Sequence, residues 1–356
     1  MKQLTLKIDL IKKLKSISGI NELDLIKAKL DLLKSDIKEK SGKKNSTITF
    51  ALNGASSEID KEFFFKEIDQ ILKTKTKERT LYYLARLSKS LSENKSGKIN
   101  DLNLNRWKEY EDLLTDSLWI IDKRDQSGAH NAGYWGNFIP QIPNQLLRRF
   151  TKKGEWVLDT FCGSGTTLIE CKRLGRNCIG VELNSDVVRL ANKNLEKDKT
   201  HSETKSLVIE GDSCKIDFNA ELKKSEINSV QLIIMHPPYW DIIKFSQNKN
   251  DLSNSKSADD FLKMFGKVID NTFPLLDKGR YLAVVIGDKY SAGEWIPLGF
   301  YVMQEVLKRK YKLKSTIVKN FDTTKGKMNQ KELWRYRALA GGFYIFKHEY
   351  IFLFQK

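Results

Sequence analysis

The sequence predicts an α/β fold in which a doubly wound parallel sheet follows a mainly helical region. From about residue 118 onward, short apolar runs typical of buried strands alternate with segments of helical periodicity. That alternation is the pattern of a parallel sheet covered by helices on both faces. Before that point the chain is rich in charge, and its apolar residues recur at helical spacing. We therefore expect a helical accessory domain over residues 1–115 and a second domain over residues 116–356.

The elements of the first domain follow from the spacing of leucine and isoleucine. Helices are expected over residues 10–17, 23–33, 58–73, 77–92 and 103–117, and the segment TITFAL (47–52) is typical of a short strand. No motif in this region indicates a chemistry. It is expected to act as an accessory domain.

The second domain contains apolar runs bounded by turn residues, which predict seven strands. They lie at 155–161, 177–183, 206–211, 231–236, 280–288, 313–321 and within the final segment 342–356. Helical patterns separate them, for example at 166–175 and 257–273. These elements predict a doubly wound α/β domain, in which helices cover both faces of a parallel sheet.

The composition favours a cytoplasmic protein with a nucleic-acid partner. The net charge is +17, and residues 305–337 contain eleven basic residues against three acidic ones, interleaved with aromatic residues. Basic segments with aromatic side chains suit phosphate backbones and unstacked bases. No apolar run is long enough for a membrane span, and the N-terminus lacks the pattern of a signal peptide, so no membrane partner is expected. The four cysteines are scattered without metal-site spacing, so no metal is expected.

The stretch VLDTFCGSGTTLIECKRLGRNCIGVELN (157–184) indicates a nucleotide-like cofactor. A buried strand ends in Asp159, a glycine-bearing turn follows, and a second strand ends in Glu182, where a carboxylate can accept hydrogen bonds from ribose hydroxyls. The third glycine of a dinucleotide fingerprint is missing, since Leu168 occupies that position. Asp159 would repel a pyrophosphate but attract the ammonium of an amino acid, which favours S-adenosylmethionine (AdoMet). The expected cofactor-binding residues in this part of the chain are Asp159, Phe161, Gly163, Ser164, Gly165, Thr166, Glu182 and, after the third strand, Asp212.

DTFCGSGTTL (159–168), GVELN (180–184) and HPPYW (236–240) together resemble the DNA amino-methyltransferases, which use AdoMet to methylate N6 of adenine or N4 of cytosine. The match covers roughly residues 118–356, with Thr160 in place of the family's proline. It implies a Rossmann-like methyltransferase sheet. It also implies that Asn137, Phe138, Ile139 and Pro140, in a motif upstream of the glycine turn, line the cofactor pocket. The order of the motifs is that of one of the family's circularly permuted groups.

The HPPYW segment is expected to hold the target base. An exocyclic amino group is a poor nucleophile until acceptors for its two hydrogens turn its lone pair toward the methyl donor. The resemblance assigns one acceptor to the carbonyl of Pro237 and the other to the preceding side chain, which is His236 here instead of the family's Asp, Asn or Ser. A neutral imidazole can accept one hydrogen bond. Tyr239 matches the position that stacks on a flipped base, and Pro238 stiffens the loop.

His236 removes the usual clue to the base. Trp240, expected to contact the substrate, resembles the cytosine-N4 members, whereas the motif order leans to adenine. The segment 320–342 is expected to be a mobile loop over the DNA backbone and the flipped base. Its expected contacts are Lys325, Lys327, Trp334, Arg335 and Arg337.

The predicted function is that of a site-specific methyltransferase of double-stranded DNA, in a restriction-modification or defence system. Residues 1–115 are expected to contribute DNA recognition or homodimerisation. Two alternatives remain open at this point. One is an RNA methyltransferase acting on the exocyclic amine of guanine in tRNA, and the other is a nucleic-acid-binding scaffold in which His236 marks lost catalysis.

Overall fold

The computed structural model describes residues 9–40, 46–52, 55–130, 133–200, 203–321 and 331–356. The chain divides into two compact units. One comprises the residues up to 98 together with 102–113, and the other comprises 99–101 together with 114–356. None of the helices in the described ranges is both long and apolar enough to cross a membrane.

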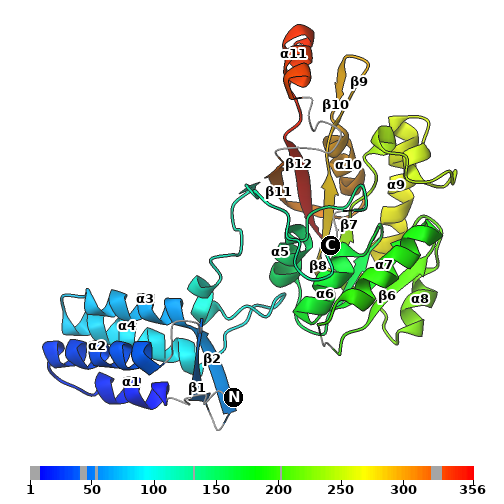
Figure 1. Ribbon diagram of the computed structural model, residues 1–356. Coiled ribbons are helices and arrows are strands. Elements are labelled where there is room, and N and C mark those ends of the chain that lie inside the picture. Colours follow the sequence, from blue (N-terminus) through cyan, green and yellow to red (C-terminus); the bar gives the residue numbers. More distant parts are fainter. Residues whose placement is uncertain (1–8, 41–45, 53–54, 131–132, 201–202, 322–330) are drawn as a thin grey trace. The chain divides into compact units, whose positions relative to one another are not determined.

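The N-terminal unit packs helices side by side with a short hairpin at one end (Figure 1). Its elements are α1 (Leu10–Ser18), α2 (Leu23–Lys40), β1 (Thr47–Leu52), β2 (Ala55–Asp60), α3 (Lys61–Leu72), α4 (Lys77–Ser92) and the 3-10 helix η1 (Leu104–Glu109). Strands β1 and β2 pair antiparallel. The apolar faces of the helices and Phe50 of β1 form one buried cluster, so this unit has a hydrophobic core of its own.

The prediction of a helix over residues 103–117 is wrong. Only 104–109 are helical, as a 3-10 turn, and Arg106 within it has non-helical backbone angles. The side chain of Asn103 accepts a hydrogen bond from the Asn105 backbone and so caps a short turn. Asparagine favours this local bonding over a continuous helix.

The second unit is an eight-stranded sheet with helices on both faces, which confirms the predicted α/β class. Its strand order is β3-β11-β12-β8-β7-β4-β5-β6. The strands are β3 (Leu118–Trp119), β4 (Trp156–Asp159), β5 (Asn177–Glu182), β6 (Ser206–Glu210), β7 (Val230–Met235), β8 (Leu276–Ile286), β11 (Lys312–Asn320) and β12 (His348–Gln355). All neighbouring strands run parallel except that β12 is antiparallel to both β8 and β11.

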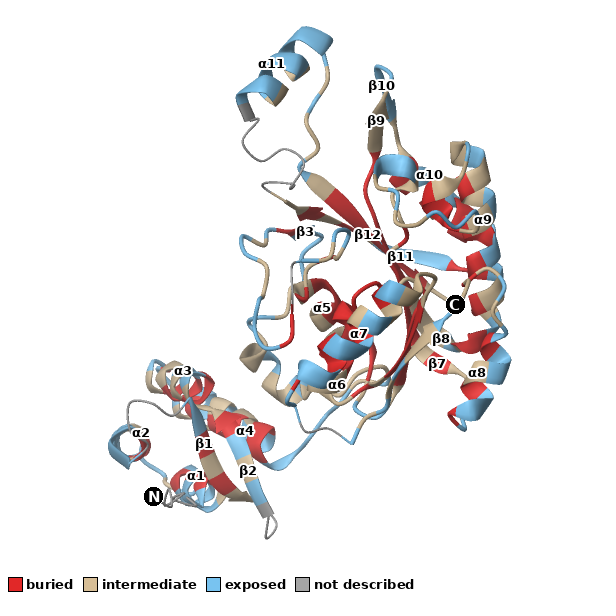
Figure 2. Cartoon of the chain, turned by 45° about the vertical axis from the view of Figure 1, so that its right-hand side comes forward, coloured by how far each residue is buried: buried red, intermediate tan, exposed pale blue. Residues whose placement is uncertain are grey.

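The helices cover the two faces of this sheet in two layers (Figures 1 and 2). One layer contains α5 (Gln141–Phe150), α6 (Thr166–Leu174) and α7 (Ser185–Lys197), and the other contains α8 (Phe218–Lys224), α9 (Ala258–Thr272) and α10 (Leu298–Leu307). Successive residues of β7 face the two layers. Leu232 belongs to the hydrophobic cluster on the side of α5 and α6, and Ile233 belongs to the cluster on the side of α8, α9 and α10. Side chains alternate across a strand, so both faces of the central strands are buried.

Besides the two-residue edge strand β3, two elements at one end of this unit were not predicted. The hairpin of β9 (Lys289–Ser291) and β10 (Glu294–Ile296) follows β8, and residues 331–341 of the expected loop form a helix, α11 (Lys331–Gly341). Both project beyond the end of the sheet (Figure 1). The rings of Tyr290 in β9 and Phe343 after α11 stack with their centroids 4.4 Å apart.

The strand order places the predicted motifs at one edge. β4 lies between β5 and β7. The chain passes from β4 to β5 and β6 on one side and then returns to β7 on the other side, so the strand order reverses at β4. Open parallel sheets bind ligands at the carboxyl ends of the strands beside such a switch point. Asp159 ends β4, and His236 directly follows the neighbouring strand β7.

Candidate active site

The carboxylate at the end of β4 is buried and incompletely bonded. Asp159 is fully buried. Its Oδ1 accepts a hydrogen bond from the Phe161 backbone at 3.0 Å, while its Oδ2 has no hydrogen-bond partner among the described residues. Burial raises the pKa of this carboxyl from 3.8 to about 6. A buried acceptor with an unused oxygen fits a cationic group of a ligand.

The glycine turn presents its backbone to the second strand. Gly163 and Gly165 have φ angles of +50° and +89°, which glycine adopts without a steric penalty. The Gly163 N–H donates to Glu182 Oε2 at 3.1 Å, and the Asn184 N–H donates to Oε1 at 2.9 Å. Burial raises the pKa of the Glu182 carboxyl. Thr166 begins α6 immediately after the turn and is buried, and Phe161 packs against the core.

Thr160, which replaces the family's proline, has a backbone role. Its N–H donates to the carbonyl of Ile234 at 3.3 Å, and its own carbonyl accepts from the Ser213 hydroxyl at 2.7 Å. A proline could not make the first of these bonds. The exchange therefore adds one hydrogen bond between the end of β4 and the strand that leads to His236.

The segment 134–140 covers the turn. Asn137 donates through Nδ2 to the Ser164 hydroxyl at 2.5 Å, and Phe138 is buried with its ring centroid 4.8 Å from that of His236. Pro140 is buried at the start of α5, and Ile139 packs on the same core face. The Asn137–Ser164 bond and the Phe138–His236 contact thus connect this segment to both the glycine turn and the HPPYW loop.

Tyr134 belongs to the same surface and was missed by sequence reasoning. A Cβ atom built on Gly163 would lie 3.1 Å from its ring, and Glu182 contributes, after burial, to raising the pKa of its hydroxyl. Only its place in the motif GYWGNFIP could have indicated it.

Asp212, after β6, accepts from the Cys214 N–H through Oδ1 at 2.9 Å and pairs with Lys215 through Oδ2 at 3.3 Å.

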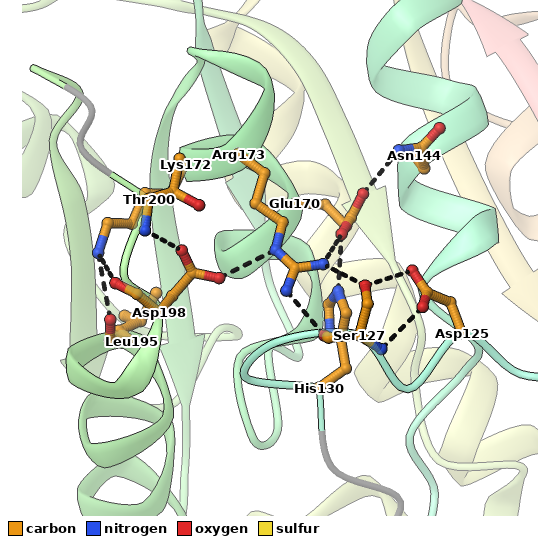
Figure 3. A network of polar contacts seen from close by, with 10 residues as sticks. All are labelled: Asp125, Ser127, His130, Asn144, Glu170, Lys172, Arg173, Leu195, Asp198 and Thr200. Carbon is orange, nitrogen blue, oxygen red and sulfur yellow. Dashed lines mark hydrogen bonds and ion pairs between the residues drawn. The ribbon is translucent and has the colours of Figure 1, made fainter. Parts of the chain in front are cut away.

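A buried polar network connects the loop of residues 125–130, which precedes the segment 134–140, to α6 (Figure 3). His130 Nε2 lies 2.6 Å from Glu170 Oε1, and Asn144 donates to Glu170 Oε2 at 2.7 Å. Arg173 donates to the Ser127 carbonyl at 2.7 Å and to Asp198 at 2.9 Å. The side chains of His130 and Glu170 are 1% and 4% exposed, so this pair is a fixed attachment point for the chain that leads to residues 134–140.

The HPPYW loop leaves β7 at the same edge. Pro237 is buried, and its carbonyl accepts no hydrogen bond from the part of the chain that the structure describes. His236 Nε2 lies 3.2 Å from the Tyr239 hydroxyl, which donates to Glu349 Oε2 at 2.8 Å. His236 keeps some exposed surface, but desolvation of its ring in the loop lowers its pKa to about 4. The imidazole is therefore neutral near pH 7, as an acceptor must be.

Trp240 and Pro238 complete the loop. Trp240 has a positive φ of 51°, an uncommon backbone conformation for a bulky residue that clusters at functional sites. Its Nε1 donates to the Ser255 carbonyl at 3.0 Å, and Lys289 Nζ lies 3.8 Å from the ring centroid. One face of the indole is thus covered by a cation. Pro238 is partly exposed between these residues.

Three of the expected nucleic-acid contacts lie on one helix after β11. Trp334, Arg335 and Arg337 are on α11, where both arginines are exposed and the Arg337 guanidinium lies 5.3 Å from the Trp334 ring centroid. Lys325 and Lys327 fall outside the described residues. Within the described ranges, no group of three or more His, Cys, Asp or Glu side chains is placed to hold a metal ion.

Comparison with known families gives two matches. The family model described as DNA methylase (N6_N4_Mtase) matches residues 10–193 and 230–356, which is most of both units. A second model, described as RNA cap guanine-N2 methyltransferase, matches residues 154–283. The first match begins at residue 10 and so extends well before the motifs from which a resemblance was predicted.

Individual relatives are more distant. The Type II methyltransferase M.MjaII of Methanocaldococcus jannaschii is 27% identical over 219 residues, covering 57% of this chain and 34% of the relative. M2.DpnII of Streptococcus pneumoniae is 38% identical over 97 residues, covering 26% and 33%. A protein of M. jannaschii named as a candidate ribosomal RNA large subunit methyltransferase is 27% identical over 179 residues, covering 48% and 44%.

The chain thus spans well under two thirds of the length of these curated relatives. Among solved structures, a methyltransferase from Pyrococcus furiosus is 15% identical with a TM-score of 0.39, covering 66% of this chain and 88% of that one. TrmN from Thermus thermophilus is 16% identical with a TM-score of 0.38, covering 62% and 49%.

Proposed function

Because the chain belongs to the DNA methylase family, we propose that it transfers a methyl group to an exocyclic amino group of a base in double-stranded DNA. The observation that carries the proposal is the meeting of two motifs at one sheet edge, where the Phe138 ring lies 4.8 Å from His236. Adenine N6 is the preferred target, and a restriction-modification or defence system is the preferred setting. The Type II methyltransferase names of several relatives support that setting.

S-adenosylmethionine is the cofactor of this family, and when bound it supplies an electrophilic methyl group on a sulfonium centre. The residues of the edge fit such a group. The unused Oδ2 of Asp159 suits its ammonium, and Glu182 keeps lone pairs for ribose hydroxyls beside the two backbone bonds that orient it. The Asn137–Ser164 bond holds the covering segment over the glycine turn. Asp212 is proposed to accept from the adenine amino group.

The HPPYW loop is proposed to hold the target amino group. The Pro237 carbonyl and the His236 ring supply the two acceptors, and the low pKa of His236 keeps its ring neutral. Each acceptor takes one amino hydrogen, which turns the nitrogen lone pair out of conjugation with the base ring. A base in a duplex reaches such a loop only after leaving the stack. Tyr239 is proposed to present its ring to the everted base.

The remaining proposals concern DNA recognition. The exposed Arg335 and Arg337 of α11 suit phosphate contacts, together with Lys325 and Lys327 of the preceding segment. The N-terminal unit, which has a core of its own, is proposed to contribute recognition or homodimerisation. No membrane association enters the proposal, and a cytoplasmic location suits a DNA substrate.

A second candidate function has a specific observation in its favour. The model described as RNA cap guanine-N2 methyltransferase matches residues 154–283, a range that contains both motifs. Guanine N2 is also an exocyclic amine, so the same two acceptors would serve it. The DNA methylase model covers more of the chain, including the N-terminal unit.

Acceptor tests with labelled AdoMet distinguish these functions. The full-length protein is incubated with tritiated AdoMet and either duplex DNA, tRNA, ribosomal RNA or no acceptor. We expect label in duplex DNA. Label in RNA alone would support the second candidate and reject the first, and binding of AdoMet without transfer to any acceptor would support a scaffold.

The Tyr239→Ala variant tests the division of labour between the motifs. It should lose methyl transfer while AdoMet affinity, measured by calorimetry, stays within about twofold, because no contact of Tyr239 with the cofactor motif is proposed. Loss of AdoMet affinity in this variant would contradict that division.

A further inference from the structure

Four side chains form a hydrogen-bonded series that ends at His236. Lys319 on β11 and Glu349 on β12 are directly opposite in the antiparallel register, with Lys319 Nζ 3.2 Å from Glu349 Oε1. Glu349 Oε2 accepts from the Tyr239 hydroxyl at 2.8 Å, and that hydroxyl lies 3.2 Å from His236 Nε2. Lys319 and Glu349 are 4% and 9% exposed. The series is therefore fixed by two paired strands in the sheet.

The chemistry of these groups assigns every proton in the series. A carboxylate that already accepts from an ammonium has no proton to give, so Tyr239 must donate its single hydroxyl proton to Glu349. The hydroxyl oxygen then accepts from His236, which requires a proton on Nε2. A neutral imidazole carries one proton, so Nδ1 is left as an acceptor. Nδ1 has no hydrogen-bond partner among the described residues.

We propose that Lys319, Glu349 and the Tyr239 hydroxyl are positioning residues that hold His236 in its Nε2–H tautomer, so that Nδ1 accepts the hydrogen bond from the target amino group. This inference rests on the proposed function. It gives a histidine the role that a carboxylate, amide or hydroxyl oxygen has elsewhere in the family. It also assigns a second role to Tyr239, through its hydroxyl, beside that of its ring.

A matched pair of variants locates the accepting atom. Nδ1 is two bonds from Cβ, as is the amide oxygen of asparagine, whereas Nε2 is three bonds away, as is the amide oxygen of glutamine. His236→Asn should therefore retain kcat within about tenfold of wild type. His236→Gln should lose about 10²-fold, the typical cost of removing one transition-state hydrogen bond. Equal AdoMet affinities in both variants serve as the control. A glutamine variant more active than the asparagine variant would overturn the proposal.

Nitrogen NMR tests the tautomer without requiring activity. The chain has four histidines, so ¹⁵N-histidine labelling gives few signals, and His236→Asn identifies the one from His236. We expect the Nε2–H tautomer in wild type. In Tyr239→Phe the ring is kept but the acceptor for Nε2–H is lost, so the signal should shift toward a mixture of tautomers. In the same variant kcat should fall about tenfold with unchanged KM for DNA.

The two failures are distinguishable. An Nδ1–H tautomer in wild type, or an unchanged tautomer and kcat in Tyr239→Phe, would overturn the positioning role while leaving DNA methylation intact. Wild-type protein that shows the Nε2–H tautomer but transfers no methyl group to DNA would contradict the proposed function instead.

Discussion

Asp159, the proposed partner of the cofactor's ammonium, also affects the stability of the fold. Its carboxyl is buried with one oxygen unpaired, and burial raises its pKa from the ordinary value of 3.8 to about 6. A raised pKa means that the folded state binds a proton more readily than the unfolded state does. The stabilising effect is therefore complete below about pH 4 and is lost as the pH rises through about 6. The full difference corresponds to about 3 kcal/mol.

This residue gives the first prediction. Without AdoMet, the free energy of unfolding of wild type should fall between about pH 4 and pH 6 relative to that of Asp159→Asn, which has no titrating group at this position. Urea unfolding at a series of pH values measures the difference. The same variant should bind AdoMet at least about tenfold more weakly, because a neutral amide replaces the charged partner of an ammonium. Parallel pH dependence in the two proteins would show that Asp159 does not titrate in this range.

The low pKa of His236 gives a second prediction, about the pH profile of activity. The folded pKa is lowered from 6.5 to about 4, so the neutral form is present throughout the range from pH 5 to pH 8. The kcat profile should therefore have no limb near pH 6.5 that depends on this residue. Profiles of wild type and His236→Asn should be parallel between pH 5 and pH 8. A limb near 6.5 in wild type that the variant lacks would mean that the ring is exposed to solvent.

Among the elements, α6 bonds the loop that precedes the covering segment (residues 134–140). Glu170 on its buried face bonds both the loop at His130 and α5 at Asn144 (Figure 3). Removing one member of a buried charged network leaves the others without compensation and costs about 3 kcal/mol or more.

The third prediction follows from this attachment. Glu170→Ala should lower the free energy of unfolding by about 3 kcal/mol. It should also increase amide hydrogen exchange in residues 125–140 and weaken AdoMet binding, although Glu170 is not placed in the cofactor site. Glu221→Ala is the matched control, since its partner Lys224 is largely exposed, and it should cost less than about 1 kcal/mol. Equal effects of the two variants would show that the network does not hold the segment.

Sequence periodicity predicted the buried strands of the sheet, but not the more exposed hairpin β9–β10 and helix α11. The strands β4, β5 and β7 were predicted because both their faces are buried and most of their residues are apolar, with polar residues near the strand ends. The hairpin β9–β10 was not, because its six strand residues include a glutamate, a lysine and a serine and have no clear alternation. Helix α11 was missed because none of its residues from 332 to 341 is buried, so no apolar stripe marks it.

The residues of the candidate site also differ in whether a local sequence pattern could indicate them. Residues carried by contiguous motifs, such as Asp159 and His236, could be proposed from local sequence. Lys319 and Glu349 could not, because their relation to His236 depends on the pairing of β11 with β12 and on a contact across 110 residues of chain. No local pattern distinguishes a buried lysine–glutamate pair from a solvated one.

At the scale of the whole molecule, the boundary between the two units does not follow the chain. Residues 99–101 belong with the second unit although 102–113 belong with the first. Asp101 pairs with Arg176, whose side chain is 3% exposed, at 2.8 Å, and the Ile99 carbonyl accepts from Arg280 at 3.1 Å. The segment therefore contributes directly to the fold of the second unit.

Two fragments provide the fourth prediction. A fragment of residues 99–356 should be more stable to urea than one of 114–356 by about 2 kcal/mol, because the shorter one leaves the buried Arg176 without its carboxylate. Asp101→Asn in the longer fragment should reproduce most of that loss. Equal stability of the two fragments would show that residues 99–101 are not part of the second unit. Both should bind AdoMet, and the proposed role of the N-terminal unit predicts that both bind DNA more weakly than the full chain.

Identifying the methylated nucleoside tests most directly the proposal that this protein methylates an exocyclic amino group of a base in DNA. Duplex DNA treated with the full-length protein and AdoMet is digested to nucleosides, which are identified by chromatography and mass. We expect N6-methyladenine, with none formed by a His236→Leu variant, which lacks an acceptor at that position. Methylation at a ring carbon, methylation confined to RNA, or undiminished product from the leucine variant would contradict it.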